Sequence, residues 1–91
     1  MKNFLTMNLT EIKLLLPIKK LLTYYNITIN HNHHIHCPFH DDKTPSCRIY
    51  EDTNTFYCFA CGKNGDVIDF VMYKEALTKH RAILKAKEIA E

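Results

Sequence analysis

The chain contains no long apolar run, no glycine- or serine-rich linker and no internal repeat. No apolar stretch approaches the length that a membrane-spanning helix needs. Near the start, Phe4 and Leu5 are soon followed by Asn8 and Glu11, so the sequence has no apolar segment of the kind found in secretory signals. We therefore expect a cytoplasmic location, where cysteines normally stay reduced.

The chain also lacks a strong excess of positive charge. Twelve basic and ten acidic side chains give a formal net charge of +2. Basic residues are in excess only within residues 1–30. Proteins that coat duplex DNA through phosphate contacts are usually far more basic, so any nucleic-acid contact here should be local and modest.

With 91 residues, the chain is long enough for one small domain, and we expect that domain to span residues 1–91. We divide it into a helical lead-in over 1–26, a metal-bound ribbon over 27–63 and C-terminal helices over 64–91. A core of this size is marginal, and domains of this length often depend on a metal ion, disulfides or a partner.

Cysteine and histidine form two close pairs, Cys37-Pro-Phe-His40 and Cys58-Phe-Ala-Cys61. In each pair, two ligands separated by two residues let one tight turn direct both side chains at a single ion. Two such turns complete the tetrahedron of a structural zinc site. A closed site of four protein ligands leaves no position for a substrate water, so we expect one structural Zn²⁺ and no catalytic residues. Two disulfides are the alternative, but they require an oxidising compartment.

The segment before the first pair is expected to form two helices. Asn8 and Glu11 have the spacing of a capping box. Leu9, Ile12 and Leu16 then recur at helical spacing. Pro17 should end this helix and begin a second short helix over about residues 17–25, because proline suits a first helical turn.

Short β-branched and aromatic runs follow, separated by polar turns. They span residues 27–29, 35–37, 47–50 and 55–58, with 51–54 as a hairpin loop between the last two. Asp66 and Thr78 then suit the N-caps of two further helices. The expected fold class is small α+β: a zinc ribbon, with a short antiparallel sheet, flanked by N-terminal and C-terminal helices.

The stretches CPFHDDKTPS and FYCFACGKNGDVIDF resemble the CHC2 zinc-binding domain found at the N-terminus of bacterial and phage DNA primases. The resemblance is specific over residues 37–70, and residues 12–27 resemble the helical lead-in of plasmid and mobile-element members. It rests on these positions: Cys37, Pro38, Phe39, His40, Lys43, Thr44, Pro45, Ser46, Phe56, Cys58, Phe59, Cys61, Gly62, Gly65, Asp66, Ile68 and Phe70.

This resemblance implies that Cys37, His40, Cys58 and Cys61 are the zinc ligands. It further implies a sheet that takes part in recognising single-stranded DNA template before primer synthesis. In such primases the polymerising chemistry belongs to a separate Toprim-type domain, and this chain ends before one. We therefore expect no enzyme activity from the chain alone, and DNA primase activity only with a catalytic primase or polymerase subunit. A helicase is a further partner of the expected kind.

The sequence departs from the family pattern at two positions. Ala60 stands where the family usually has glycine, which would be strained if that position needs a positive φ. Cys47 stands where the family tends to have an aromatic or large apolar residue. It could replace His40 as a ligand, but a buried cysteine acting as a small hydrophobe is the favoured interpretation.

Strand alternation places Arg48 and Tyr50 on one face, with Tyr57 facing the same way from the next strand. Cation and aromatic rings together are typical of single-strand binders, because every base has a face to stack and every nucleotide a phosphate. Lys43 and Lys63 adjoin the two ligand turns and could also contact phosphates. The alternative is that the aromatics only cover a thin sheet and the lysines are simply solvated.

The patch from His31 to His36 could form an exposed loop, a strand with alternating histidines or a weak second metal site, and the loop is favoured. Asp66 and Asp69 suit helix capping better than catalysis. A zinc ribbon of this kind could also act as a protein–protein docking module or accessory subunit of a replication complex without contacting DNA. Fold alone does not separate these functions.

Overall fold

Two short helices open the described part of the chain, residues 7–91, in this computed structural model. α1 spans Leu9–Leu15 and begins at Asn8, whose side-chain oxygen accepts a hydrogen bond of 2.9 Å from the Glu11 N–H. α2 spans Ile18–Tyr24 and begins directly after Pro17. The predicted cap at Asn8 and the predicted break at Pro17 are both confirmed.

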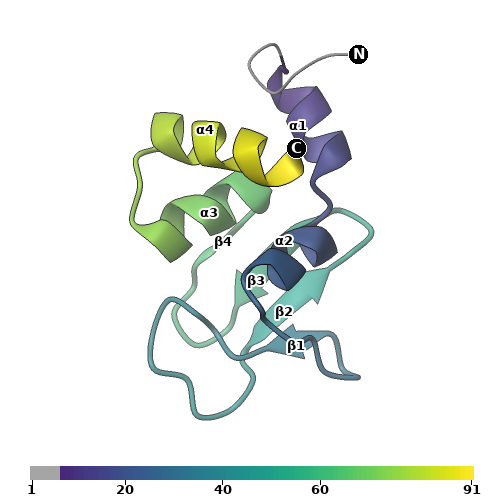
Figure 1. The fold of residues 1–91 in the computed structure, drawn as a ribbon. Coiled ribbons are helices and arrows are strands. Elements are labelled where there is room, and N and C mark those ends of the chain that lie inside the picture. Colours follow the sequence, from purple (N-terminus) through teal and green to yellow (C-terminus); the bar gives the residue numbers. More distant parts are fainter. Residues whose placement is uncertain (1–6) are drawn as a thin grey trace.

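The centre of the chain forms a four-stranded antiparallel sheet in the order β1-β2-β3-β4 (Figure 1). β2 (Cys47–Tyr50) and β3 (Thr55–Cys58) form the hairpin that the sequence predicts, with residues 51–54 as its loop. Two-residue strands, β1 (His34–Ile35) and β4 (Asn64–Gly65), flank the hairpin.

Three details of the sheet differ from the predictions. The segment 27–29 is not a strand; Ile27 and Ile29 instead pack against the core as partly buried side chains of an irregular segment. The strand expected over 35–37 is shifted to His34–Ile35, because the backbone turns away at Cys37 to present the first ligand. β4 was not predicted at all, and it adds one strand beside β3.

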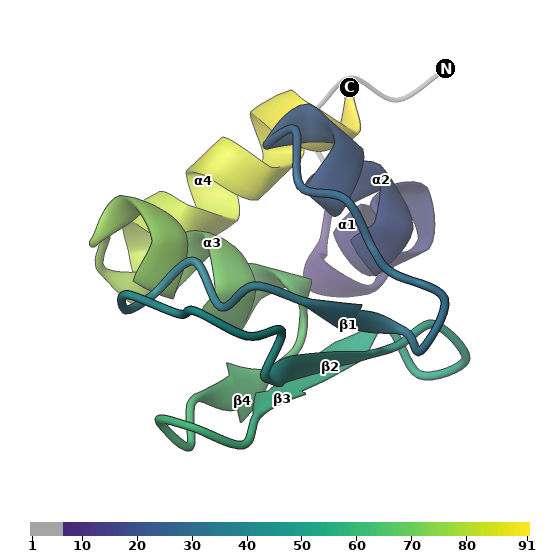
Figure 2. The same ribbon diagram turned by 90° about the horizontal axis from the view of Figure 1, so that it is seen from below.

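Two further helices close the fold. α3 (Val67–Glu75) begins at the predicted N-cap Asp66, and a complete capping box forms there because the Asp69 carboxylate accepts a hydrogen bond from the Asp66 N–H. α4 (Lys79–Ala90) begins at Thr78, whose hydroxyl accepts from the Arg81 N–H. Turned by 90°, the molecule shows all four helices on one side of the sheet (Figure 2).

The strand register explains why one face of the sheet is buried and the other is open. Facing the helices, Ile49 of β2 lies opposite Phe56 of β3, and both side chains are buried. Facing outward, one row of directly paired residues crosses all four strands, and we call it the outer row: His34, Arg48, Tyr57 and Asn64. The helices cover the apolar face, so the outer row lies on the helix-free face.

Across residues 7–91, none of the helices combines the length and the apolar character needed to cross a lipid bilayer.

Candidate metal centre

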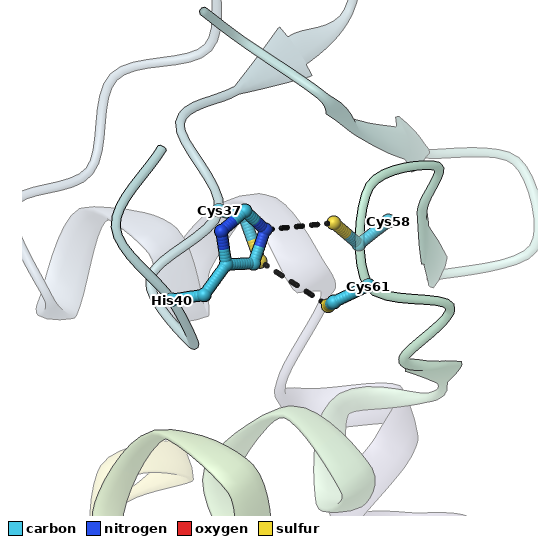
Figure 3. Close-up of side chains that lie close together, drawn as sticks. All are labelled: Cys37, His40, Cys58 and Cys61. Atoms are coloured by element: carbon cyan, nitrogen blue, oxygen red, sulfur yellow. Dashed lines mark hydrogen bonds between the residues drawn. The ribbon is translucent and has the colours of Figure 1, made fainter. Parts of the chain in front are cut away.

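The four predicted ligands come from two segments that meet at the end of the β2–β3 hairpin where β3 finishes. Cys37 and His40 lie in the loop that leads from β1 to β2. Cys58 is the last residue of β3, and Cys61 lies in the turn that follows it. The close-up shows the two pairs facing each other across a small gap (Figure 3).

The geometry of this cluster fits one zinc ion. The ligand atoms of the four side chains all lie within 4.8 Å of one another. The Cys37 and Cys61 sulfurs are 3.9 Å apart, and His40 Nε2 is 3.4 Å from the Cys58 sulfur. Zinc–sulfur and zinc–nitrogen bonds of about 2.3 and about 2.0 Å imply tetrahedral edges of roughly 3.8 Å and 3.5 Å. Three thiols and one imidazole are also ligands that zinc prefers, and all four cysteines of the chain are free of disulfides.

The ring of His40 is oriented as a zinc-binding histidine would be. Its Nδ1 lies 3.0 Å from the carbonyl oxygen of Asp41, and because a carbonyl can only accept, Nδ1 carries the proton. This leaves Nε2 directed at the cysteine sulfurs. A ligating histidine normally has its second nitrogen held by such an outer hydrogen bond, which fixes the tautomer and the ring plane.

The ready ionisation of the Cys58 thiol also favours binding of a metal cation. Burial opposes ionisation of Cys58, but the hydrogen bond from His40 is the largest of the contacts that outweigh it and lower the pKa of this thiol to about 6. The Cys58 thiolate in turn raises the pKa of His40. Burial raises the pKa of the Cys37 thiol. Cys58 is therefore the thiol that ionises ahead of Cys37, and metal binding releases the remaining protons.

Asp42 holds the first ligand loop in place, although the sequence analysis did not single it out. Its Oδ2 accepts hydrogen bonds from the Cys37 N–H at 2.7 Å and from the Ser46 hydroxyl at 2.9 Å. The hydrogen bond from the Cys37 N–H is the main reason that the pKa of Asp42 is lowered. The Ser46 oxygen lies 3.6 Å from the Cys58 sulfur, so one carboxylate links both ligand pairs.

Phe39 anchors the same loop from within the first ligand pair. Its ring lies 5.6 Å from that of Phe56, 5.1 Å from Phe70 and 5.5 Å from Tyr73, measured between centroids. These partners come from β3 and α3. The metal cluster is therefore fastened to the aromatic part of the core, and loss of the metal would loosen that packing.

The two departures from the family pattern have simple structural outcomes. Cys47 is fully buried on the helix-facing side of β2 and lies outside the four-ligand cluster. Burial raises the pKa of its thiol to about 12, so it remains an uncharged core residue. Ala60 is not among the described residues with a positive φ, so alanine fits there without strain.

The structure brings together three of the five residues predicted to contact nucleic acid. Arg48 is paired directly with Tyr57, and its guanidinium carbon lies 5.2 Å from the ring centroid of Tyr50. Lys43 is exposed in the ligand loop. Lys63 is instead placed beside α3, with its ammonium 5.6 Å from the ring centroid of Tyr73.

Two residues of this face were missed as candidates. Phe59 is 64% exposed, and its ring centroid lies 4.9 Å from that of Tyr57, so the two rings form one aromatic surface. The period-two alternation already placed both rings on one side, and that signal could have identified Phe59. His34 enters the outer row only through the register of β1 with β2.

The remaining candidates have structural positions. The histidine patch divides between a turn at residues 31–33 and β1, which contains His34. Within residues 7–91, the cluster of Cys37, His40, Cys58 and Cys61 is the only place where three or more histidine, cysteine, aspartate or glutamate side chains bring their ligand atoms close together. Asp66 and Asp69 are occupied in the capping box of α3.

Comparisons with known proteins agree with this geometry. A sequence model of the CHC2 zinc finger family matches residues 7–91. A DNA primase of Buchnera aphidicola subsp. Baizongia pistaciae is 38% identical over 76 residues, which are 84% of this chain and 11% of that protein. The DNA primase of Escherichia coli K12 is 44% identical over 46 residues, 50% of this chain and 8% of that protein.

The fold has a counterpart among solved structures. The crystal structure of the zinc-binding and RNA polymerase domains of the Aquifex aeolicus primase superposes with a TM-score of 0.74 at 28% identity. The superposition covers 97% of this chain and 21% of that one. The similarity to the primases is therefore confined to a small part of their length. The chain belongs to the CHC2 zinc finger family, the zinc-binding domain of DnaG-type DNA primases, and its Cys37, His40, Cys58 and Cys61 form a site able to bind one zinc ion.

Proposed function

We propose that this domain binds single-stranded DNA template on the helix-free face of its sheet and presents it for primer synthesis. The observation that carries the proposal is the grouping of one arginine with exposed aromatic rings on that face. Arg48 lies beside Tyr50 on β2 and opposite Tyr57 on β3, and Phe59 extends the aromatic surface. Bases stack on exposed rings regardless of sequence, while the guanidinium attracts phosphate.

The zinc serves this function indirectly. The four ligands close the site, so the ion supplies rigidity rather than a reactive water. It fixes the end of the β2–β3 hairpin, since Cys58 is the last residue of β3. With β3 fixed in this way, the aromatic side chains on the helix-free face keep their positions even though the domain has only a small core.

Primer synthesis itself would be carried out by a catalytic part of the Toprim type, in the same or another chain. The relatives are DNA primases, and the described fold holds a closed metal site and no second cluster of acidic ligands within residues 7–91. On this proposal the domain alone has no polymerase activity and acts in the cytoplasm, with a catalytic subunit or a helicase as its protein partner. An origin in a plasmid or other mobile element stays a prediction.

Fluorescence anisotropy with an oligothymidylate and with a DNA hairpin, each at two salt concentrations, tests the proposal. The single strand should bind more tightly, and its affinity should fall as salt rises. Tyr57→Ala should weaken binding roughly 5- to 150-fold, since stacking contributes ~1–3 kcal/mol per base. Arg48→Gln should reduce the salt dependence, whereas Arg81→Gln, an equal charge change on exposed α4, should not.

A second function is favoured by a different surface. Leu14 is 74% exposed and Leu15 52% exposed, and both lie on α1, which contributes no ligand to the metal cluster. Neighbouring exposed leucine side chains on one helix suit docking on another protein. If neither DNA binds in the anisotropy measurement, the template-binding proposal is wrong and the docking function takes its place.

A further inference from the structure

An open hollow of about 570 Å³ lies at the β1 end of the outer row. It is bounded by the turn of residues 30–34 on one side and by Pro45 and Arg48 on the other. No aspartate or glutamate lines it, whereas three histidines and one arginine do. Within residues 7–91 these histidines do not bring three ligand atoms together as a metal site would, whereas the arginine and any protonated histidine would attract an anion.

The wall of the hollow is held by a network centred on Asn30. The Asn30 side-chain oxygen accepts from the N–H groups of Asn32 and His34, at 2.9 Å each. The backbone adds bonds from the Asn30 N–H to the His34 carbonyl and from the His33 N–H back to Asn30. His33 has a positive φ of 63°, which this network maintains. The histidines therefore project from a fixed turn.

The tautomer of His34 determines whether its Nε2 can donate a hydrogen bond to an anion. Its Nδ1 lies 2.7 Å from the Asn32 carbonyl, so Nδ1 carries a proton that it donates to that oxygen. In the neutral ring, Nε2 is then an acceptor, which disfavours an anionic oxygen. Only the protonated ring presents an N–H from Nε2. Histidine is the side chain whose charge normally changes near neutral pH.

Arg48 supplies the second half of the site. It is the direct cross-strand partner of His34, so both side chains leave the same face of the sheet. Among the described residues, Arg48 Nε has no hydrogen-bond partner and is shielded from solvent. A buried donor without an acceptor is unfavourable. Rotation of the guanidinium toward an oxygen in the hollow would satisfy it.

We infer that His34 and Arg48 together bind a phosphate of the nucleic-acid backbone in this hollow, and that protonation of His34 tightens the contact. This rests on the proposed function, because it assigns one phosphate subsite at the end of the outer row. The other titratable groups near His34 are His31 and His33, and His33 Nδ1 lies 3.6 Å from Glu51. Glu51 also lies 3.7 Å from Lys19, so its charge is shared outside the hollow.

The test uses oligothymidylate with the zinc-loaded protein at pH 6.0 and pH 8.0. Neither thymine nor a phosphodiester changes charge between these values, so any pH dependence comes from the protein. The expected result is roughly tenfold tighter binding at pH 6.0, the size of one hydrogen bond to a charged group. His34→Gln should abolish most of this difference. His80→Gln, which removes an exposed histidine of α4, should leave it intact.

A second measurement, made on the wild type and on His34→Gln, identifies the site without DNA. Sulfate is a tetrahedral anion whose charge is constant over this pH range. In a ¹H–¹⁵N titration it should shift the signals of residues 30–34 and 48 more at pH 6.0 than at pH 8.0. The 15N signal of His34 should report its protonation in the same samples.

The outcomes separate this inference from the proposed function. Single-strand binding whose pH dependence is unchanged in His34→Gln, with no sulfate shifts in the hollow, overturns the inference and leaves the proposed function standing. Sulfate shifts in the hollow without any DNA binding support an anion site but overturn its assignment to a nucleic-acid phosphate, together with the proposed function. Loss of both the pH difference and the sulfate shifts in His34→Gln supports the inference.

Discussion

Two neighbouring aspartates in the ligand loop have very different surroundings. Asp42 accepts hydrogen bonds from the Cys37 N–H, the Ser46 N–H and the Ser46 hydroxyl. Asp41 is exposed, and the contact it provides to His40 comes from its backbone carbonyl, which a side-chain change does not remove. At the scale of single residues, outer-shell groups such as Asp42 set how well the ligands are positioned.

Asp42→Ala should weaken zinc binding about 10- to 100-fold, because the Cys37 turn loses the acceptor that fixes it. Competition with a chromophoric zinc chelator measures this affinity directly. Asp41→Asn is the matched control, since it removes a carboxylate one position away and keeps the carbonyl on His40. Equal zinc affinities for the two variants would show that Asp42 does not position the ligand loop.

The four ligands could be predicted from the sequence because their spacing carries the geometry of the site. Asp42 could not, because nothing in the sequence distinguishes it from Asp41 before the loop is folded. His34 is a similar case. Its place beside Arg48 depends on the register of a two-residue strand, and a shift by one residue would have turned it to the other face.

At the scale of elements, Asp66 joins two helices. It caps α3 by accepting from the N–H groups of Ile68 and Asp69, and its other oxygen lies 2.8 Å from the Lys13 ammonium on α1. Burial alone would raise the pKa of Asp66, but Lys13 and the helix N–H groups outweigh burial and lower it. One side chain thus connects the N-terminal and C-terminal helices.

Asp66→Ala should lower the free energy of unfolding by about 1–2 kcal/mol, most of it from the lost cap. Asp66→Asn should cost less, because asparagine caps helices well and only the partly exposed ion pair with Lys13 is lost. A carboxyl group whose pKa is lowered by folding contributes its full stabilisation at every pH above the pKa of the unfolded chain, about 3.9. That stabilisation is lost only as the pH falls below this value. The difference between wild type and Asp66→Ala in chemical denaturation should therefore be the same at pH 5.5 and pH 8.0.

A difference that grows or shrinks between those pH values would contradict the assignment to an ionised Asp66. Denaturation at both pH values is followed with zinc in excess, so that changes in metal occupancy do not enter the comparison.

Elements with strong local signals could be predicted, and weaker ones could not. β2 and β3 have clear alternation, and the helices have capping residues and apolar periodicity. β4 has only Asn64 and Gly65, neither of which favours strands, so its pairing with β3 arises from the chain path after Cys61. Ile27 and Ile29 have strong strand propensity, but their burial against the core takes precedence, and they form no ladder.

At the scale of the whole molecule, the zinc cluster joins segments that are far apart in the sequence. It ties the loop before β2 to the end of β3, and Phe39 couples that loop to α3. Binding of a structural zinc contributes ~10–16 kcal/mol in small peptides, which is as large as the entire stability of a typical domain. The folded state of this chain should depend on the metal.

A strong zinc chelator should abolish the cooperative thermal unfolding transition seen by circular dichroism, and added zinc should restore it. Cys58→Ser should behave like the chelated protein, because it removes a ligand from the cluster. Cys47→Ala should keep one zinc per chain and a cooperative transition at a reduced Tm, because Cys47 is buried outside the site. A cooperative transition that survives in metal-free Cys58→Ser would show that the core folds without zinc.

The short outer strands have a consequence for how this domain can associate. β1 and β4, the two edges of the sheet, contain two residues each. So short an edge offers few free N–H and C=O groups, which limits both edge-to-edge aggregation and the addition of a strand from another chain. Any protein that docks here is expected to be recognised through side chains on the faces of the fold, and main-chain pairing at the sheet margins should contribute little.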